Sequence, residues 1–395
     1  MEIDSLQRLL EARVFERDKC QEELATFIYP VLTLPSEITS EIFTHFLPVF
    51  PARCPLVGSR SPAHLARICR AWRNVALATP TLWNAIELDI AGHPELYERQ
   101  LHLLTTWLTR SGGCPLSIAL VYRGQTSVAA FVEAIVHHAS RWQDMELLLP
   151  YDDLPHLTGV MPLLRTLTLG PDTLRTASAP VADPVAIFTE APYLREVMLF
   201  NCFNPFRITL PWSQITKLTA GLYEPEAVVI LRDAAVLEEC CLTLFGDEMW
   251  PTLSLPLIPP LLRLRSLALL GSINIIGAAE VGRFLLPALT LPALEAIEVF
   301  EPFLGADPVA TLSALRPHGC PQRIVISGAR YTSDTATPYE MYAAAFPEAT
   351  VYVDLEYESD SDSDRLDSVS DQPNSDSDRL DSDSDEPNSG SDLSE

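Results

Sequence analysis

A phrase of the form Leu-x-x-Leu-x-Leu recurs through the middle of the chain and constrains the fold more than any other feature. Its copies begin at Leu164, Leu194, Ile215, Leu237, Leu264 and Leu294, and an earlier copy is expected at Trp142. Repeats at periods of roughly 20–50 residues are typical of solenoids, in which stacked turns bury a shared core. The spacing therefore predicts an α/β solenoid over residues 89–355, with residues 324–326 as a candidate last strand.

These repeats resemble leucine-rich repeats, which contribute one short strand per turn to a parallel sheet. The alternative is a set of ordinary amphipathic strands in an α/β domain. It stays open because the spacing is irregular, with a longer step from Leu164 to Leu194 than from Leu194 to Ile215. The Asn position of regular repeats is also mostly missing.

The concave strand face of such a solenoid is a candidate target-binding surface. Alternate residues of a strand point to the same face, so the second, fourth and sixth positions after the first Leu lie there. Large side chains, aromatic ones above all, act as anchors in protein interfaces. We therefore expect a target protein to bind at Met198, Phe200, Leu270, Glu298 and Phe300. Alternatively, loops or a final helix cover these positions.

Residues 1–29 have the spacing of an amphipathic helix. Apolar residues recur at alternating intervals of three and four from Ile3 to Phe27, but Arg13 and Arg17 interrupt the series. We expect a helix that docks on the next segment. A coiled-coil dimer is the alternative, since heptad spacing is its signature.

Residues 30–88 predict a small helical domain. Ser36 is a candidate N-cap after Pro35, and Ile38 and Ile42 share one helix face with Phe43 and Phe46. Residues 48–62 are rich in proline and predict a loop. Helical spacing returns from residue 65 to residue 76 and ends at Thr79-Pro80. Two or three short helices are too few for an independent enzyme.

The same segment resembles an F-box, in particular the F-box-like domains of mushroom-forming fungi. The resemblance is carried by four short motifs: Leu34-Pro35-x-Glu37-Ile38, Glu41-Ile42-Phe43, Ile68-Cys69-Arg70-x-Trp72-Arg73 and Pro80-x-Leu82-Trp83. Together these motifs span most of the segment, from Leu34 to Trp83. The sequence departs from the family at Thr39, where Leu is usual, and in the insertion at residues 48–62.

The resemblance implies the substrate-recognition subunit of a cullin–RING ubiquitin ligase of the SCF type. Such a subunit binds a Skp-type adaptor and, through it, a cullin, while divergent leucine-rich repeats after the F-box hold the target. The implied adaptor contacts are Leu34, Pro35, Ile38, Ile42, Phe43, Ile68, Cys69 and Trp72. Some of these must pack inside the domain, and the sequence does not divide them.

Composition excludes several other classes of protein. The 53 acidic residues outnumber 27 basic ones, giving a net charge of -26, which argues against binding to nucleic-acid backbones. No run of about 20 apolar residues predicts a membrane span, and the first residues do not predict a signal peptide. The eight cysteines form no Cys-x-x-Cys pair, so we expect reduced thiols in a cytoplasmic or nuclear protein.

Lysine is nearly absent, since only Lys19 and Lys217 occur. In a ligase subunit, this scarcity would limit modification by its own ligase. Arg bias from GC-rich coding explains it equally well.

Residues 356–395 predict a disordered acidic tail. Residues 354–395 carry 16 acidic and 2 basic residues, and residues 361–374 are nearly repeated at 375–388. Ser361 and Ser375 precede acids in the pattern that acidophilic casein-type kinases modify. A solvated spacer is the simpler alternative, and calcium binding is disfavoured because a flexible chain lacks a preformed loop.

Motifs for catalysis, metals and cofactors are missing from the sequence. It contains no phosphate-binding Gly-Lys-Ser/Thr, Gly-x-Ser-x-Gly or His-Glu-x-x-His pattern. We therefore expect a non-enzymatic protein without a cofactor. Two rival hypotheses are a repeat scaffold whose F-box-like helices only cap the solenoid, and a hydrolase-like enzyme with a diverged site.

Overall fold

The computed structural model describes residues 2–26, 30–48, 51–90, 93–122, 127–170, 188–200, 209–245, 257–271, 285–313, 321–329 and 338–355. By its internal contacts the chain divides into Met1–Glu356 and Tyr357–Glu395. All described residues belong to the first unit. The expectations for the acidic tail, including Ser361 and Ser375, therefore lie outside the described residues.

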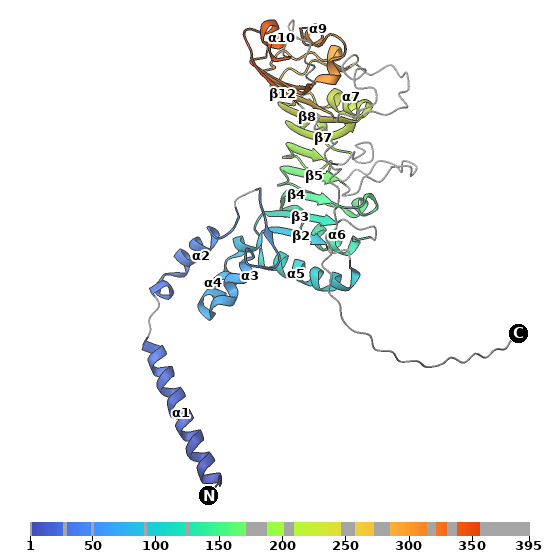
Figure 1. Ribbon diagram of the computed structural model, residues 1–395. Helices are drawn as coiled ribbons and strands as arrows, with labels where there is room; N and C mark the ends of the chain where they lie inside the picture. The colour runs from blue at the N-terminus through green and yellow to red at the C-terminus, as the bar shows by residue number, and fades with distance from the viewer. Residues whose placement is uncertain are drawn as a thin grey trace, which may run out of the picture. The chain divides into compact units, whose positions relative to one another are not determined.

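Twelve parallel strands form one sheet in which spatial order follows sequence order (Figure 1). Every neighbouring pair is parallel. The strands are β1 (Cys54–Pro55), β2 (Ala85–Ile90), β3 (Leu116–Tyr122), β4 (Trp142–Leu148), β5 (Thr166–Gly170), β6 (Glu196–Leu199), β7 (Lys217–Tyr223), β8 (Glu239–Phe245), β9 (Ser266–Leu270), β10 (Ala296–Phe300), β11 (Arg323–Ala329) and β12 (Thr350–Leu355). This arrangement is the predicted α/β solenoid-like fold.

The repeated phrase builds the core because its apolar residues align across strands. Leu167 pairs in register with Val197, which pairs with Leu218, and the column continues through Cys240 and Leu267. Each of these side chains is almost fully buried. Burial of one such side chain stabilises the fold by roughly 1.5–3 kcal/mol, so a column through the sheet outweighs any single surface contact.

Helices connect several of the strands. Among them are α5 (Tyr97–Arg110), α6 (Ala129–Val136), α7 (Glu224–Asp233), α9 (Pro308–Ser313) and α10 (Pro338–Ala345). On α5, Leu104, Trp107 and Leu108 share one buried face, as i, i+3 and i+4 spacing requires. The indole of Trp107 meets Trp83 edge-on with 5.1 Å between ring centroids. This contact joins α5, which connects β2 to β3, to the segment before β2.

The N-terminal helices are α1 (Glu2–Thr26), α2 (Ser36–Thr44), α3 (Pro62–Ile68) and α4 (Arg70–Ala78), with 3-10 turns η1 (Pro30–Thr33) and η2 (Pro80–Trp83). The expected N-cap at Ser36 is wrong: α2 begins at Ser36, Pro35 occupies the cap position, and no side chain caps the helix. Instead, Ser61 caps α3 by accepting from the Ala63 amide at 3.2 Å. The Cys69 thiol accepts from the Trp72 amide and caps α4.

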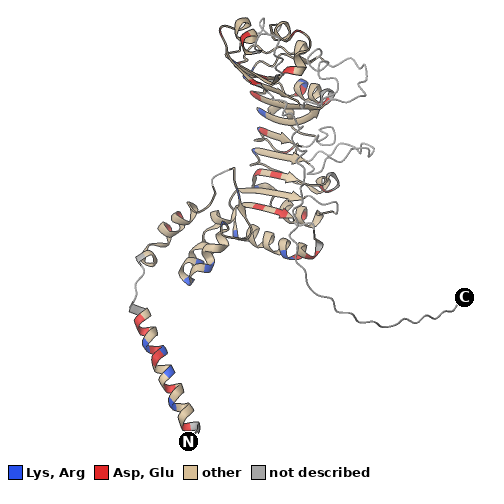
Figure 2. Ribbon diagram, viewed as in Figure 1, with Lys and Arg blue, Asp and Glu red and all other residues tan. Residues whose placement is uncertain are grey.

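The apolar stripe of helix α1 is exposed. Every side chain described from residue 4 to residue 24 is exposed, including Leu6, Leu10 and Leu24. The expected docking of α1 on the next segment stays a prediction. Charged residues alternate along the helix (Figure 2), with Arg13 paired to Glu16 at 2.9 Å. The coiled-coil alternative stays a prediction.

The Pro-rich insertion differs from its predicted loop because it contributes the first strand of the sheet. Cys54 pairs with Ile86, and Pro55 pairs with Glu87. Just before this strand, the Arg53 guanidinium donates to Glu146 at 2.7 Å and to Ser117 at 2.9 Å. An exposed edge strand is a site for aggregation, so a short covering strand with an ion pair protects the edge at β2. Periodicity did not reveal β1, because so short a strand cannot show a pattern.

Candidate functional site

The eight predicted adaptor contacts divide into two groups in the structure. Leu34, Pro35, Ile38, Ile42 and Ile68 are exposed, whereas Phe43 is buried and Cys69 and Trp72 are half-buried. The exposed fractions of Leu34, Ile38, Ile42 and Ile68 are 38%, 50%, 48% and 53%.

Packing between α2 and α4 explains the division. The Phe43 ring meets the Trp72 ring edge-on with centroids 5.0 Å apart, and this contact holds the inner faces of the two helices together. Helical spacing then turns Ile38 and Ile42 outward. Thr39, the position at which the sequence departs from the F-box pattern it resembles, is buried. Its hydroxyl donates to the Pro35 carbonyl at 3.1 Å, so burial leaves no polar group unpaired.

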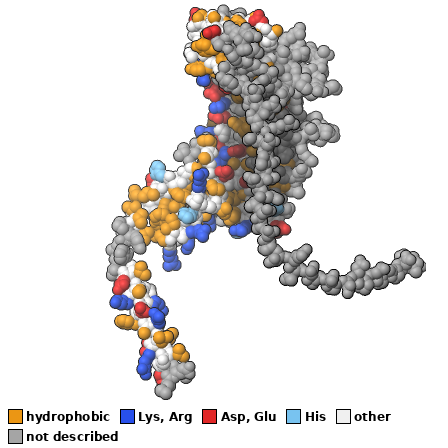
Figure 3. All heavy atoms as spheres, in the orientation of Figure 1, with side chains coloured by type: hydrophobic (Ala, Val, Ile, Leu, Met, Phe, Trp, Pro, Cys, Tyr) orange, Lys and Arg blue, Asp and Glu red, His pale blue; other side chains and the backbone are white. Residues whose placement is uncertain are grey.

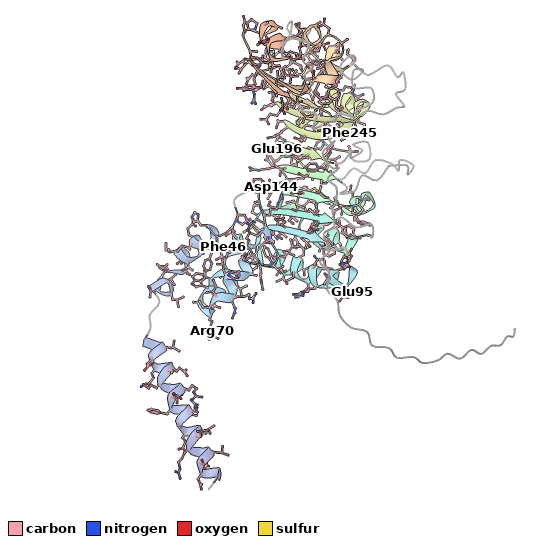
Figure 4. The ribbon with its side chains drawn as sticks, viewed as in Figure 1. Phe46, Arg70, Glu95, Asp144, Glu196 and Phe245 are labelled. Atoms are coloured by element: carbon pink, nitrogen blue, oxygen red, sulfur yellow. The ribbon has the colours of Figure 1, made fainter. Side chains whose placement is uncertain are left out.

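A broader apolar area surrounds the exposed group. We call it the N-terminal apolar surface; it consists of Val31, Leu32, Leu34, Ile38, Ile42, Phe46 and Ile68, which are all exposed. Figure 3 shows apolar side chains gathered over these helices, and Figure 4 labels Phe46 at this place. Large exposed apolar patches mark interaction sites. Our sequence reasoning missed Val31 and Leu32, although the run Val31-Leu32-Thr33-Leu34 already pointed to an apolar entry segment.

The predicted target-binding residues follow the sheet, but they do not form one continuous patch. Met198 lies on β6, Phe200 directly follows β6, Leu270 ends β9, and Glu298 lies on β10. Phe200 is 40% exposed, and Met198, Leu270 and Glu298 are half-buried. Since neighbouring strands lie about 4.8 Å apart, Phe200 and Leu270 are separated by roughly 14 Å across the sheet.

The expectation that Phe300 is an exposed anchor is wrong, because its side chain is only 3% exposed. Its ring meets Phe303 edge-on with centroids 5.3 Å apart. It also occupies the space above Gly328, where an added Cβ would lie 2.2 Å from the ring. Gly328 has φ of 67°, a conformation that glycine adopts without strain. Because Gly328 on the neighbouring strand β11 has no side chain, the Phe300 ring packs in that space and is buried. The Leu-x-x-Leu-x-Leu phrase that contains Phe300 does not include Gly328, so it cannot predict this packing.

Phe200 has the opposite environment. Its amide donates to the Leu169 carbonyl at 2.8 Å, which places it beside Gly170. A Cβ added to Gly170 would lie 2.9 Å from the Phe200 Cβ. Extending the register of β6 and β7 places Gly221 on the other side. Small neighbours leave the ring exposed, so Phe200 meets the physical requirement for an anchor.

An open groove of about 540 Å³ lies where β4, β5 and β6 begin. Its lining residues are Gln143, Asp144, Arg165, Thr166, Tyr193, Arg195 and Glu196, and Figure 4 labels Asp144 and Glu196. Asp144 is buried and accepts from the Thr166 hydroxyl at 2.8 Å. Arg195 donates to the Pro192 and Leu194 carbonyls at 3.0 and 2.8 Å. Two arginines and two acids balance, so the groove suits a polar peptide better than an anion.

Sequence reasoning missed this groove as well. The available signal was the recurrence of Arg directly after the first Leu of the phrase, at Arg165, Arg195 and Arg265. Each of these arginines directly precedes the first residue of its strand. It is therefore not one of the alternating strand residues whose side chains point into the core.

The described residues contain no metal-binding cluster. Among them, no group of three or more His, Cys, Asp or Glu side chains could hold a metal ion. Burial, with a smaller effect of Glu87, raises the pKa of the Cys54 thiol to about 11. Burial also raises the pKa of the Cys240 thiol well above its usual range. A thiol is nucleophilic only as the thiolate, so these two cysteines are unreactive core residues near neutral pH.

Comparison with known proteins adds no further assignment. The chain matches no model of a known protein family, and no curated protein sequence matches it. Within the part of the chain that the structure describes, no helix is long and apolar enough to span a membrane.

Proposed function

We propose that this protein is the substrate-recognition subunit of an SCF-type cullin–RING ubiquitin ligase. Residues 30–88 act as an F-box that binds a Skp-type adaptor, and the sheet acts as a divergent leucine-rich-repeat solenoid that binds the target. The adaptor in turn recruits the cullin. This places the protein in the cytoplasm or the nucleus.

The observation that carries the proposal is the exposure of Ile38, Ile42 and Ile68 on helices whose other faces are packed, together with exposed Leu34 just before α2. Burying four such side chains would be a large part of the energy of an interface, at roughly 25 cal/mol per Å² of apolar surface. Phe43 and Trp72 support the surface from beneath and do not contact the adaptor. The remaining exposed residue among the candidate adaptor contacts, Pro35, fixes the chain direction into α2.

The solenoid holds the target on the face formed by the second, fourth and sixth positions of each repeat. Phe200 is the anchor at the end of β6, and Met198 extends it. The groove at the start of β4–β6 lies at the opposite end of β6 and receives polar groups of the same target. Leu270 on β9 and Glu298 on β10 lie farther from Phe200 across the sheet. They therefore contact the target only if it is large enough to extend over several strands.

The protein contributes proximity and no covalent chemistry. A target held on the same chain as the adaptor site meets the ligase at high effective concentration. The strand pair of β1 and β2 and the Arg53–Glu146 ion pair restrict movement of the adaptor-binding helices against the first strands. Because Lys19 and Lys217 are the only lysines, the subunit is a poor acceptor of ubiquitin. Phosphorylation at Ser361 and Ser375 would add charge to the acidic tail.

The test is capture of a purified Skp-type adaptor by the full chain. An Ile38→Asp/Ile42→Asp variant should lose binding at least tenfold, because it places charge in an apolar contact. The matched control is Leu257→Asp, at an exposed leucine before β9. It should bind as the unchanged chain does. Absence of binding by an unchanged chain that unfolds cooperatively would refute the ligase role.

The second candidate is a scaffold in which the helical segment only caps the solenoid. It is favoured by β1, which covers the first edge of the sheet, and by the burial of Leu82 and Trp83 beneath the helices. This candidate predicts that target capture persists while no adaptor binds.

A further inference from the structure

The segment around α3 and α4 has a charge that contrasts with the rest of the chain. Residues 42–86 contain no Asp or Glu, although the whole chain has 53 acids in 395 residues. The same segment contains five arginines, at positions 53, 60, 67, 70 and 73, and two histidines. This segment is therefore a local region of net positive charge in a strongly acidic protein.

Four of these arginines form what we call the basic rim: Arg60, Arg67, Arg70 and Arg73. Arg53 does not belong to it, because it is paired with Glu146 and its side chain is only 10% exposed. The four rim residues are exposed, and none makes an ion pair with another residue that the structure describes. The Arg73 Nε donates to the Ala66 carbonyl at 2.8 Å, which holds this side chain across the junction of α3 and α4.

The basic rim adjoins the N-terminal apolar surface. Ile68, a member of that surface, lies between Arg67 and Arg70 at the junction of the two helices. Packing of α2 on α4 through Phe43 and Trp72 joins the rim to the helix that carries Ile38 and Ile42. Figure 2 shows basic residues on α4, and Figure 3 shows them beside the apolar side chains. A partner that covers the apolar surface therefore approaches unpaired positive charge.

We propose that the partner of the N-terminal apolar surface presents acidic side chains to Arg60, Arg67, Arg70 and Arg73. This inference rests on the proposed function and describes the adaptor in more detail: an apolar groove bordered by Asp and Glu. Apolar contacts then determine how slowly the complex dissociates, and the charges determine how fast it forms.

An acidic protein fits this region better than a nucleic acid does. Nucleic-acid interfaces are polar and strongly basic, and they rarely bury aliphatic side chains in number. Here seven exposed apolar residues lie beside four arginines.

The experiment measures association and dissociation rates of the full chain with a purified Skp-type adaptor at several salt concentrations. The test variant is Arg67→Gln/Arg70→Gln. The control is Arg99→Gln/Arg263→Gln, which removes the same charge from exposed positions on α5 and before β9. The test variant should associate about tenfold more slowly in low salt, with little change in dissociation rate. The difference should shrink at about 1 M salt, where the Debye length is roughly 3 Å.

The outcomes separate this inference from the proposed function. Adaptor binding in which the test variant and the control associate equally fast would overturn the acidic partner and leave the ligase role intact. No adaptor binding by the folded, unchanged chain would overturn both. A DNA duplex probe forms the second arm, and duplex binding that Arg67→Gln/Arg70→Gln abolishes would assign the rim to nucleic acid instead.

Discussion

The sheet and the N-terminal helices use similar apolar spacing with opposite results. In the sheet, the apolar residues of each phrase are buried, because the next repeat supplies a matching row. In α2, one apolar face packs on α4 through Phe43, while the side chains of Ile38 and Ile42 are exposed to solvent. Apolar periodicity therefore predicts burial only where the chain itself provides the second layer. Where it does not, the same pattern indicates a partner.

The largest expected effect is at the junction of the two regions. Trp83 is fully buried, meets Trp107 edge-on, and donates from its indole to the Ala76 carbonyl at 2.9 Å. Trp83→Ala should lower the free energy of unfolding by about 3–5 kcal/mol, because it leaves a cavity and removes a buried hydrogen bond to the Ala76 carbonyl. Denaturant unfolding measures this loss. Leu257→Ala, at an exposed site, should change stability by less than about 0.5 kcal/mol, and an equal effect of both would contradict the packing described.

The sharpest test of the comparison uses adjacent residues of α2. Phe43→Ala should cost about 3–5 kcal/mol of unfolding free energy, since the ring is buried against Trp72. Ile42→Ala should cost less than about 1 kcal/mol, since that side chain is half exposed. Adaptor affinity should fall in the Ile42→Ala variant while its fold persists. If Ile42→Ala destabilised the chain as much as Phe43→Ala, the outward surface would not exist.

A smaller effect is expected for the ion pair between Arg53 and Glu146, where the insertion meets the sheet. A double-mutant cycle with Arg53→Met and Glu146→Gln should give a coupling energy of about 1–2 kcal/mol, because Arg53 is largely buried. The exposed pair of Lys217 and Glu239, 3.1 Å apart, is the control cycle. It should give less than about 1 kcal/mol. Equal coupling in the two cycles would mean that the insertion is not held by this contact.

The smallest expected effect is a dependence of stability on alkaline pH. Burial raises the pKa of the Cys54 thiol from 9.0 to about 11. A raised pKa stabilises the fold fully below the unfolded value and progressively less as pH rises towards the folded value. Stability should therefore fall between pH 9.0 and about pH 11, and less in Cys54→Ala. At pH 8, alkylation followed by mass spectrometry should label exposed Cys20 much faster than Cys54; equal labelling would contradict the burial.

Some features could be predicted from residues near one another in sequence, and others could not. The spacing of the phrase placed strands at residues 142–148, 166–170 and 239–245, because alternation and leucine rows are local signals. Strands β1, β2, β3 and β12 were missed, since their residues do not repeat the phrase. Within the candidate adaptor contacts, sequence selected the helices, but only packing showed that Ile42 is exposed and Phe43 is buried.

The amino-acid sequence by itself determined the solenoid-like sheet, because the alternation of a strand and the spacing of the repeats are encoded within short windows. It also determined the acidic balance and the acid-free segment at residues 42–86. Tertiary structure alone decided that the insertion becomes β1, that Phe300 folds over Gly328 while Phe200 stays exposed, and that a groove opens at the start of β4–β6. These outcomes depend on which side chain the neighbouring strand or helix supplies, and that neighbour lies far away along the chain.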